Sequence, residues 1–275
     1  MKRLINQHPR RIGKILLGLI PFLLILGVYS FASNERLEIN PNDKLMPAFS
    51  TMADSMHRMM FEPSKRSGEY LFWTDTSSSL KRLGLGVAIS AFISLVVGIF
   101  LGIIPKIRAG VAPLITAVSL IPPLAILPIL FIIFGLGEVS KVMLIVLGIT
   151  PFLIRDTQLR VMELPEEQII KAQTLGANSW QVITRVVLPQ ILPKLIDALR
   201  LSLGSAWLFL IAAEAISSTS GLGYRIFLVR RYLSMDVILP YVVWIAILAF
   251  AADYLLRRLS RSAFPWQITA TREAK

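Results

Sequence analysis

Long apolar runs, separated by shorter polar stretches, dominate the chain. They occupy residues 16–31, 84–104, 112–135, 139–154, 195–216 and 237–256. Most of them approach the roughly 20 residues that an α-helix needs to cross the hydrocarbon core of a bilayer. The pattern therefore predicts an all-α integral membrane protein with about six transmembrane helices.

The amino-terminal region predicts the orientation of the chain. Residues 2–14 hold five basic side chains and no acidic one, directly before the first apolar run. A cleaved signal peptide has a similar pattern, but Ser30-Phe31-Ala32-Ser33 is a poor cleavage site. Because basic residues stay in the cytoplasm, we expect a cytoplasmic amino terminus over 1–15 and a retained transmembrane helix over 16–32.

Six crossings return the carboxyl terminus to the cytoplasmic side. Basic residues follow the last apolar run, at Arg257, Arg258 and Arg261. Residues 257–275 are therefore predicted to form a cytoplasmic tail, as the positive-inside rule expects. The same count places the segment 160–193 in the cytoplasm.

A long polar stretch precedes the second apolar run. Residues 33–80 are predicted to be extracytoplasmic, and they contain an amphipathic segment around 48–61. Four methionines fall near one helical face of this segment: Met52, Met56, Met59 and Met60. Such a face favours packing on protein or on a lipid surface. The rest of the chain, 81–256, is predicted to form a core of five transmembrane helices.

Composition agrees with a lipid environment. Hydrophobic residues make up 55% of the 275 residues and charged residues only 17%. The net charge of +12 would favour nucleic-acid binding in a soluble protein. Here the basic residues collect beside apolar runs, where anionic headgroups attract them. We therefore expect contact with membrane lipid and no nucleic-acid partner.

The residue types also restrict the chemistry. The chain has no cysteine, and its two histidines, His8 and His57, lie far apart outside the apolar runs. A catalytic triad or a histidine metal site is therefore not expected. No Gly-x4-Gly-Lys-Ser/Thr phosphate loop occurs either. We expect a protein that is not an enzyme, without catalytic residues, metal or cofactor of its own.

Prolines interrupt the predicted membrane helices. Pro122 and Pro123 are followed by Pro128 in the third run, and the fourth run contains Pro151. Proline frees a backbone carbonyl, which a membrane tolerates only where protein or water satisfies it. Pro122 and Pro123 are therefore candidates for a translocation pathway, unless the kinks only help the helices to pack.

Charges inside apolar runs usually pair or face a cavity. Two combinations have helical spacing, Asp197 with Arg200 and Asp253 with Arg257. We expect both to be structural pairs. Glu214 falls near the outer end of the fifth run. It is expected either to pair with Lys141 or an outer arginine, or to line the outer gate of a pathway.

The segment between the fourth and fifth runs is unusually regular. One short helical pattern ends at Gly176, and a second starts after Ser179 and is expected to end at Pro189. Two short helices joined by a glycine turn make a compact knob, which either receives a partner or packs under its own helices. An apolar docking face is expected from Leu175, Ile183 and Val187.

The run Ala172-x3-Gly176-x9-Val186-x-Leu188-Pro189 resembles the EAA loop of bacterial ABC importer permeases, Glu-Ala-Ala-x3-Gly-x9-Ile-x-Leu-Pro. Further runs resemble the taurine, sulfonate and nitrate branch of that family: Ile121-Pro122-Pro123, Phe134-Gly135-Leu136-Gly137-Glu138, Thr174-Leu175-Gly176-Ala177, Ala213-Glu214 and Gly221-Leu222-Gly223-Tyr224. The chain departs from the motif at Ile170-Lys171, where the family has Glu-Ala.

The resemblance implies a type I importer permease in the bacterial inner membrane, with both termini in the cytoplasm. Expected partners are a second copy of the chain, an ATP-binding subunit that holds ATP and magnesium, and an extracytoplasmic solute-binding protein. The residues carried over to the ATPase-coupling loop are Ala172, Leu175, Gly176, Ala177, Val186, Leu188 and Pro189. The implied substrate is a small anion such as taurine, an alkylsulfonate or nitrate.

Three arginines of the last outer loop do not follow the positive-inside rule: Arg225, Arg230 and Arg231. They would suit an anion entrance. A solvated face, or salt bridges to the binding protein, would explain them equally well.

A self-sufficient secondary transporter or channel is the alternative function. It would need inverted repeats or ion-coupling carboxylates within the membrane. The sequence shows no repeat, and Glu214 is the only deep carboxylate candidate. A membrane-embedded enzyme would need clustered histidines or acids in the apolar runs, and the sequence lacks them.

Overall fold

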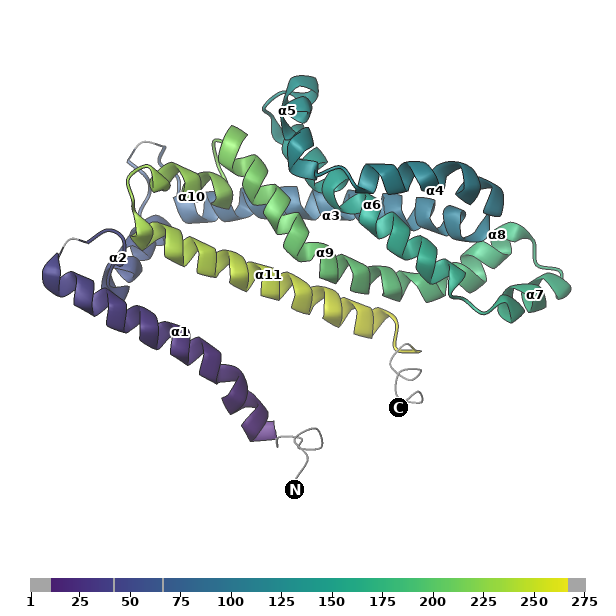
Figure 1. Cartoon of the computed structure of the whole chain (residues 1–275), viewed down its shortest axis with the longest axis horizontal. Coiled ribbons are helices and arrows are strands. Elements are labelled where there is room, and N and C mark those ends of the chain that lie inside the picture. The colour runs from purple at the N-terminus through teal and green to yellow at the C-terminus, as the bar shows by residue number, and fades with distance from the viewer. Residues whose placement is uncertain (1–10, 42, 66, 267–275) are drawn as a thin grey trace. The chain divides into compact units, whose positions relative to one another are not determined.

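A computed structural model describes residues 11–41, 43–65 and 67–266 (Figure 1). The helices are α1 (Arg11–Ile39), α2 (Phe49–Phe61), α3 (Leu71–Ile103), α4 (Pro105–Ser119), α5 (Pro123–Phe134), α6 (Glu138–Met162), α7 (Glu166–Thr174), α8 (Ser179–Gln181), the π-helical segment Val182–Val187, α9 (Leu188–Ser217), α10 (Leu222–Arg230) and α11 (Met235–Ala263). No strand occurs in these ranges, which confirms the predicted all-α class.

Five helical stretches are long and apolar enough to cross a bilayer, namely 12–39, 71–103, 138–162, 179–217 and 235–263. The pair α4 and α5 supplies a sixth crossing if it is counted as one span. The prediction of about six crossings therefore holds. The single kinked helix expected over 112–135 is wrong, because α4 and α5 meet at 97°. Pro122 is extended at this break (φ −61°, ψ 118°), as a residue before proline prefers.

Several predicted boundaries need correction. The first membrane helix is longer than 16–32, and the polar segment between α1 and α3 shortens from the predicted 33–80 to 40–70. The core begins at Leu71 rather than 81, and α11 continues into the predicted tail. Residues 1–10, including His8, and 267–275 lie outside the described residues, and they make up much of the predicted amino-terminal segment 1–15 and of the predicted tail 257–275.

The described chain divides into two compact units, an amino-terminal unit (11–70 with 229–240) and a core unit (71–228 with 241–266). In the amino-terminal unit, the loop before α2 is fixed to α1. The Tyr29 hydroxyl donates to the Pro47 carbonyl at 2.8 Å, and the Ser33 hydroxyl donates to the Met46 carbonyl at 2.9 Å. Ser55 of α2 donates to Asp236. These bonds join α1, α2 and the segment 229–240.

The surface of α1 suits lipid better than water. Large apolar side chains along it are exposed, including Phe22 (67%) and Leu23 (62%). In α2, Met52 is buried and the other three methionines are half-buried, so this face packs on protein.

In the core unit, α3 packs along α6, and α6 packs on α9. Close approach of α3 and α6 depends on a missing side chain at Gly98. A Cβ at this position would lie 2.6 Å from the Thr157 Cβ and 3.1 Å from the Ile154 carbonyl oxygen. Small residues at such positions let membrane helices pack tightly without a hydrophobic driving force.

Residues of α11 are linked to the core by polar contacts. The Trp244 indole donates to the Thr76 hydroxyl at 3.1 Å. Arg200 of α9 pairs with Asp197 at 3.0 Å, as expected, and with Asp253 at 2.8 Å. Arg257 is only 4.0 Å from Asp253, so Arg200 is the main partner of that carboxylate, and the pair predicted within α11 is secondary.

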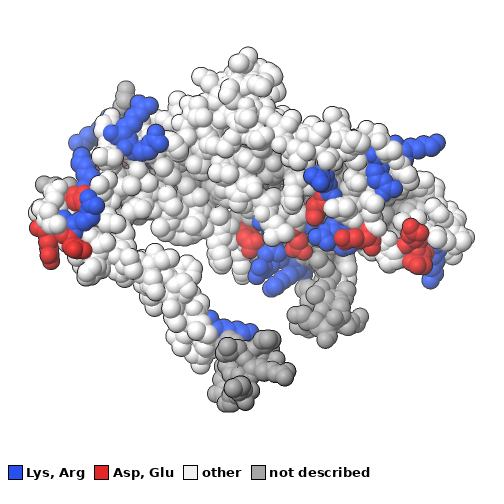
Figure 2. Space-filling view, in the orientation of Figure 1, with Lys and Arg blue, Asp and Glu red and all other residues white. Residues whose placement is uncertain are grey.

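Charged residues are unevenly distributed over the core unit. On the face shown in Figure 2, they gather near α7 and α8, near the carboxyl half of α11 and near α10, while the core helices between these groups are almost free of them. α7 and α8 lie at one end of the core helices and α10 at the other (Figure 1). A charge-poor belt between two charged ends is typical of a membrane-spanning bundle.

Substituting Gly98→Val tests the α3–α6 packing. We expect a loss of about 1–3 kcal/mol in the free energy of unfolding, because the added methyl groups force the two helices apart. Gly84→Val on the same helix is the control, since its Cβ would meet no atom within 4 Å. Unfolding in SDS, followed by tryptophan fluorescence, measures both variants. Equal stability of the two variants would contradict the close packing.

Candidate functional site

The segment 160–193 contains a hydrogen-bonded turn that its sequence explains. After α7, Gly176 adopts φ +84°, a conformation that favours glycine. Its N–H donates to the Gln173 carbonyl at 2.9 Å, and the Ala177 N–H donates to the Ala172 carbonyl at 3.0 Å. These two bonds form a Schellman motif, which satisfies the last carbonyls of a helix. The predicted glycine cap is therefore present.

A second set of bonds starts the next helix immediately. Asn178 accepts a hydrogen bond from the Gln181 N–H at 2.8 Å, and the Gln181 side chain accepts one from the Asn178 N–H at 2.9 Å. This reciprocal pair is a capping box, whose signal in the sequence is Asn-x-x-Gln. The turn between α7 and α8 is consequently fixed on both sides.

The helix that starts at Ser179 does not end at Pro189, contrary to the prediction. It runs continuously to Ser217 through the π-helical segment Val182–Val187 and α9. The Leu188 N–H donates to Ile183, five residues back. The wider π turn makes room for Pro189, which a regular helix would exclude by a clash with the preceding turn. The second helix of the knob is therefore one end of a membrane helix.

An apolar cluster fixes the segment to the core helices. Its buried members are Ile99, Val161, Leu164, Val182, Val187 and Ile191. They come from α3, α6, the loop that follows α6 and the helix that contains α9, and Ile183 is partly buried against them. The predicted docking face is therefore wrong for Val187 and Ile183, which pack inward. Leu175 remains 80% exposed, and Trp180 is 65% exposed nearby in the sequence.

The other residues carried over to this segment have mixed surroundings. Ala172 and Ala177 pack against the apolar cluster, as does Leu188. Val186 is half-buried. These residues shape and support the segment rather than forming its exposed surface.

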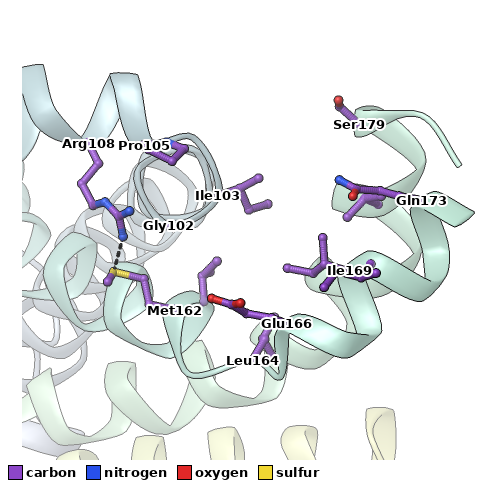
Figure 3. A pocket seen from close by; sticks show the side chains of 13 residues that line it. Gly102, Ile103, Pro105, Arg108, Met162, Leu164, Glu166, Ile169, Gln173 and Ser179 are labelled. Carbon is purple, nitrogen blue, oxygen red and sulfur yellow. Dashed lines mark hydrogen bonds between the residues drawn. The ribbon is translucent and has the colours of Figure 1, made fainter.

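A cleft of about 490 Å³ lies beside the segment, between the α3–α4 junction and α7. Figure 3 shows Arg108 and Met162 on one side of the cleft and Ile169 and Gln173 on the other. Arg108 donates to the Met162 sulfur at 2.8 Å. The segment is thus anchored through its apolar cluster, while the cleft separates α7 from the α3–α4 junction.

At the other end of α9, Glu214 lies in a largely buried charge network, whose members are Asp75, Ser79, Arg82, Glu138, Lys141, Glu214 and Arg225. Its fully buried carboxylate accepts hydrogen bonds from Ser79 at 2.7 Å and Arg82 at 2.7 Å. The Gly223 N–H adds a third bond at 2.9 Å. The prediction that an arginine pairs with Glu214 is confirmed, whereas the prediction that Lys141 does so is wrong. This carboxylate is enclosed by its partners rather than open to a gate.

Lys141 and Arg82 converge instead on Glu138. Lys141 Nζ lies 3.0 Å from Glu138 Oε1, and Arg82 Nη2 lies 2.8 Å from the same oxygen. Arg82 Nε bonds the second oxygen, which makes the guanidinium contact bidentate. Arg82 therefore joins the carboxylates of α6 and α9 from its place on α3.

Arg225 is ion-paired rather than available as an open anion entrance. Its Nε lies 2.8 Å from the fully buried carboxylate of Asp75, which also accepts from the Gly221 N–H at 2.9 Å. Burial lowers the pKa of Arg225, but the hydrogen bond and charge of Asp75 outweigh it and leave the pKa raised. Arg230 and Arg231 are exposed and belong to the amino-terminal unit.

Sequence reasoning missed Asp75 and Ser79, because they fall in the polar stretch 33–80, which was predicted to be extracytoplasmic. Asp75 lies four residues before Ser79, and Ser79 lies three residues before Arg82. These spacings place all three side chains on one face of a helix. That spacing was the available signal. In the described residues, no group of three or more His, Cys, Asp or Glu side chains could hold a metal ion.

Substituting Glu214→Ala should destabilise the core strongly. Breaking a buried ion pair from one side costs about 3–5 kcal/mol, because Arg82 and Ser79 lose their partner in a dry environment. Glu163→Ala is the control. Its pair with Arg160 is exposed, so its loss should cost less than about 0.5 kcal/mol. SDS unfolding of both variants checks this, and similar losses would contradict the buried network.

Membrane-crossing helices, a broken span and a folded segment continuous with one span define a multi-pass membrane protein. Residues 94–264 match the family model of the binding-protein-dependent transport system inner membrane component, and the chain belongs to this family. The chain is therefore a permease subunit of an ABC importer, located in the inner membrane. It works with a separate ATPase subunit and is not itself an enzyme.

Three relatives show where the chain lies within the family. The taurine transport system permease protein TauC of Escherichia coli (strain K12) is 38% identical over 194 residues, 70% of either chain. The putative aliphatic sulfonates transport permease protein SsuC of Bacillus subtilis (strain 168) is 31% identical and covers 69% of this chain and 68% of its own length. The bicarbonate transport system permease protein CmpB of Synechococcus elongatus is 30% identical, over 90% of this chain and 87% of its own.

Two solved structures share the fold. One is an inward-facing structure of the MetNI methionine ABC transporter, which aligns with a TM-score of 0.63 and 22% sequence identity. The match covers 72% of this chain and 98% of the MetNI chain. The other is a bacterial ABC transporter involved in the import of the acidic polysaccharide alginate, with a TM-score of 0.63 and 14% sequence identity. The match covers 90% of this chain and 95% of the alginate transporter chain. The type I importer permease fold expected from the sequence is therefore confirmed.

Proposed function

We propose that the chain carries a small anion of the sulfonate, nitrate or bicarbonate kind across the membrane by alternating access. The relatives named for taurine, aliphatic sulfonates and bicarbonate support this substrate class. We further propose a homodimer that receives its substrate from an extracytoplasmic binding protein. ATP and magnesium belong to the partner ATPase subunit, and this chain binds no cofactor.

The segment 160–193 is proposed as the element that docks on the ATPase subunit. The observation that carries this proposal is its construction: a doubly capped turn, held by an apolar cluster, at the end of a helix that continues to Ser217. A rigid element of this kind transmits a push, whereas a flexible loop would absorb it. Leu175 and Trp180 supply exposed apolar surface for the contact.

The proposed orientation follows from this docking. An ATPase subunit is cytoplasmic, so the segment 160–193, both chain termini and the tail lie on that side. Asp75, Arg82 and Glu214 then lie at the extracytoplasmic end. Pro122 and Pro123 remain proposed pathway residues, because a break between spans is tolerated where it faces protein or a water-filled cavity.

The departure at Ile170-Lys171 changes the proposed ATPase contact. Both residues are exposed on α7, and the acidic residues of this helix, Glu166 and Glu167, lie in its first turn. A lysine where the family has an alanine, beside an isoleucine in place of the glutamate, removes one negative charge and adds one positive charge. We propose that the ATPase partner presents a correspondingly more acidic surface there.

Substitution of Gly176 tests the coupling role. Gly176→Val should uncouple ATP hydrolysis from transport by about tenfold or more, because a β-branched residue strains a turn at positive φ. Gly176→Asn is the matched control, since asparagine tolerates this conformation. A Cβ at this position meets no atom within 4 Å, so the backbone conformation alone separates the two variants.

The measurement is co-purification of the ATPase subunit from native membranes, followed by ATPase activity and uptake in proteoliposomes. Gly176→Asn should retain the subunit and its coupling, whereas Gly176→Val should lose coupling while the membrane helices still fold. Normal uptake by Gly176→Val would show that the segment is not the coupling element.

A further inference from the structure

Two buried cations in the charge network share one exposed carboxylate. The side chains of Arg82 and Lys141 are each 4% exposed, whereas the Glu138 side chain is 63% exposed. Glu138 is nevertheless the only carboxylate in the described residues that bonds both cations. It can rotate into water at little desolvation cost, but the two cations cannot follow it.

The charge balance shows what such a rotation would leave behind. Arg82 keeps its second carboxylate, because Glu214 is fully buried and bonded at 2.7 Å. With Glu138 in place, the two cations and two carboxylates sum to zero. Without it, one buried positive charge is uncompensated, which is unfavourable unless another anion arrives. A monoanion with two or more oxygens could replace both oxygens of Glu138.

The position of Glu138 also suits a ligand site. It is the first residue of α6 and follows the glycine-rich turn 135–137, where Gly135 has φ +73°. This turn ends the broken span of α4 and α5. In membrane transporters, interrupted spans mark the places where substrate meets exposed polar groups.

We propose that Arg82 and Lys141 form a binding site for a monovalent oxyanion, which Glu138 occupies when the site is empty. The arriving anion displaces the Glu138 carboxylate and takes over its bonds to the guanidinium and the ammonium group. The proposal rests on the proposed transport of a small anion and assigns two residues to its recognition. It also explains why the two buried cations are capped by an exposed acid.

Direct binding of methanesulfonate tests the site. The permease–ATPase complex is placed in nanodiscs of zwitterionic phosphatidylcholine, so that no anionic headgroup competes, and titrated by calorimetry. Glu138→Gln should tighten binding by about tenfold, because the site is then no longer occupied by its own carboxylate. Lys141→Gln should weaken binding by a similar factor, and Lys141→Arg should restore it.

Two controls make the test specific. Lys81→Gln removes the same charge from an exposed neighbour of Arg82 that is in none of these contacts, and it should leave binding unchanged. Methanesulfonamide has nearly the shape of methanesulfonate without its charge, and it should not bind to any variant.

Unchanged methanesulfonate affinity in Glu138→Gln and Lys141→Gln would overturn the proposal, as would equal binding of methanesulfonamide. Neither result depends on the coupling role of the segment 160–193. If Gly176→Val still uncouples the complex while the anion titration shows no effect, the binding site is wrong and the importer assignment stands.

Discussion

The packing of the helices at one end of the core depends on the bonds made by the guanidinium group of Arg82. Arg82 lies on α3 and binds Glu214 of α9, Glu138 of α6 and the Ser220 carbonyl oxygen at 2.8 Å. A buried charge is tolerated only if its partners are complete, so these helix ends must keep their mutual positions. The glycines at 221 and 223 serve the same requirement. A Cβ at position 221 would strike the Glu214 carboxylate, and one at position 223 would strike the Ile211 carbonyl oxygen. An apolar side chain at position 82 could not hold the three elements together.

The two sites are joined by one continuous helix. The stretch 179–217 begins in the capped turn beside α7 and ends near Glu214. A displacement at its first turn must be transmitted along it, because the apolar cluster and the packing on α6 prevent the helix from bending freely. The π-helical segment Val182–Val187 is the one irregular turn along this path, and it lies where the helix leaves the knob. The charge network therefore lies at the far end of the element that an ATPase would move.

Local features of this fold could be predicted from the sequence, whereas features that depend on packing could not. Apolar run lengths predict the crossings, and Gly176 predicts its own cap, because both follow from one stretch of chain. The continuity past Pro189 could not be predicted, since it depends on a π turn that tertiary packing stabilises. The partner of Glu214 was also out of reach: Arg82 lies 132 residues away. Even so, the spacing of Asp75, Ser79 and Arg82 could have indicated a polar helix face.

Site-specific cross-linking tests most directly the claim that the segment 160–193 docks on the ATPase. The chain has no cysteine, so Leu175→Cys introduces a single reactive position on exposed surface. Ile132→Cys on α5, which is 83% exposed, serves as the control position. With a thiol-specific photo-cross-linker in native membranes, we expect a covalent adduct of Leu175→Cys with the ATP-binding subunit and none with Ile132→Cys. Absence of that adduct, in membranes where the complex still co-purifies, would contradict the account.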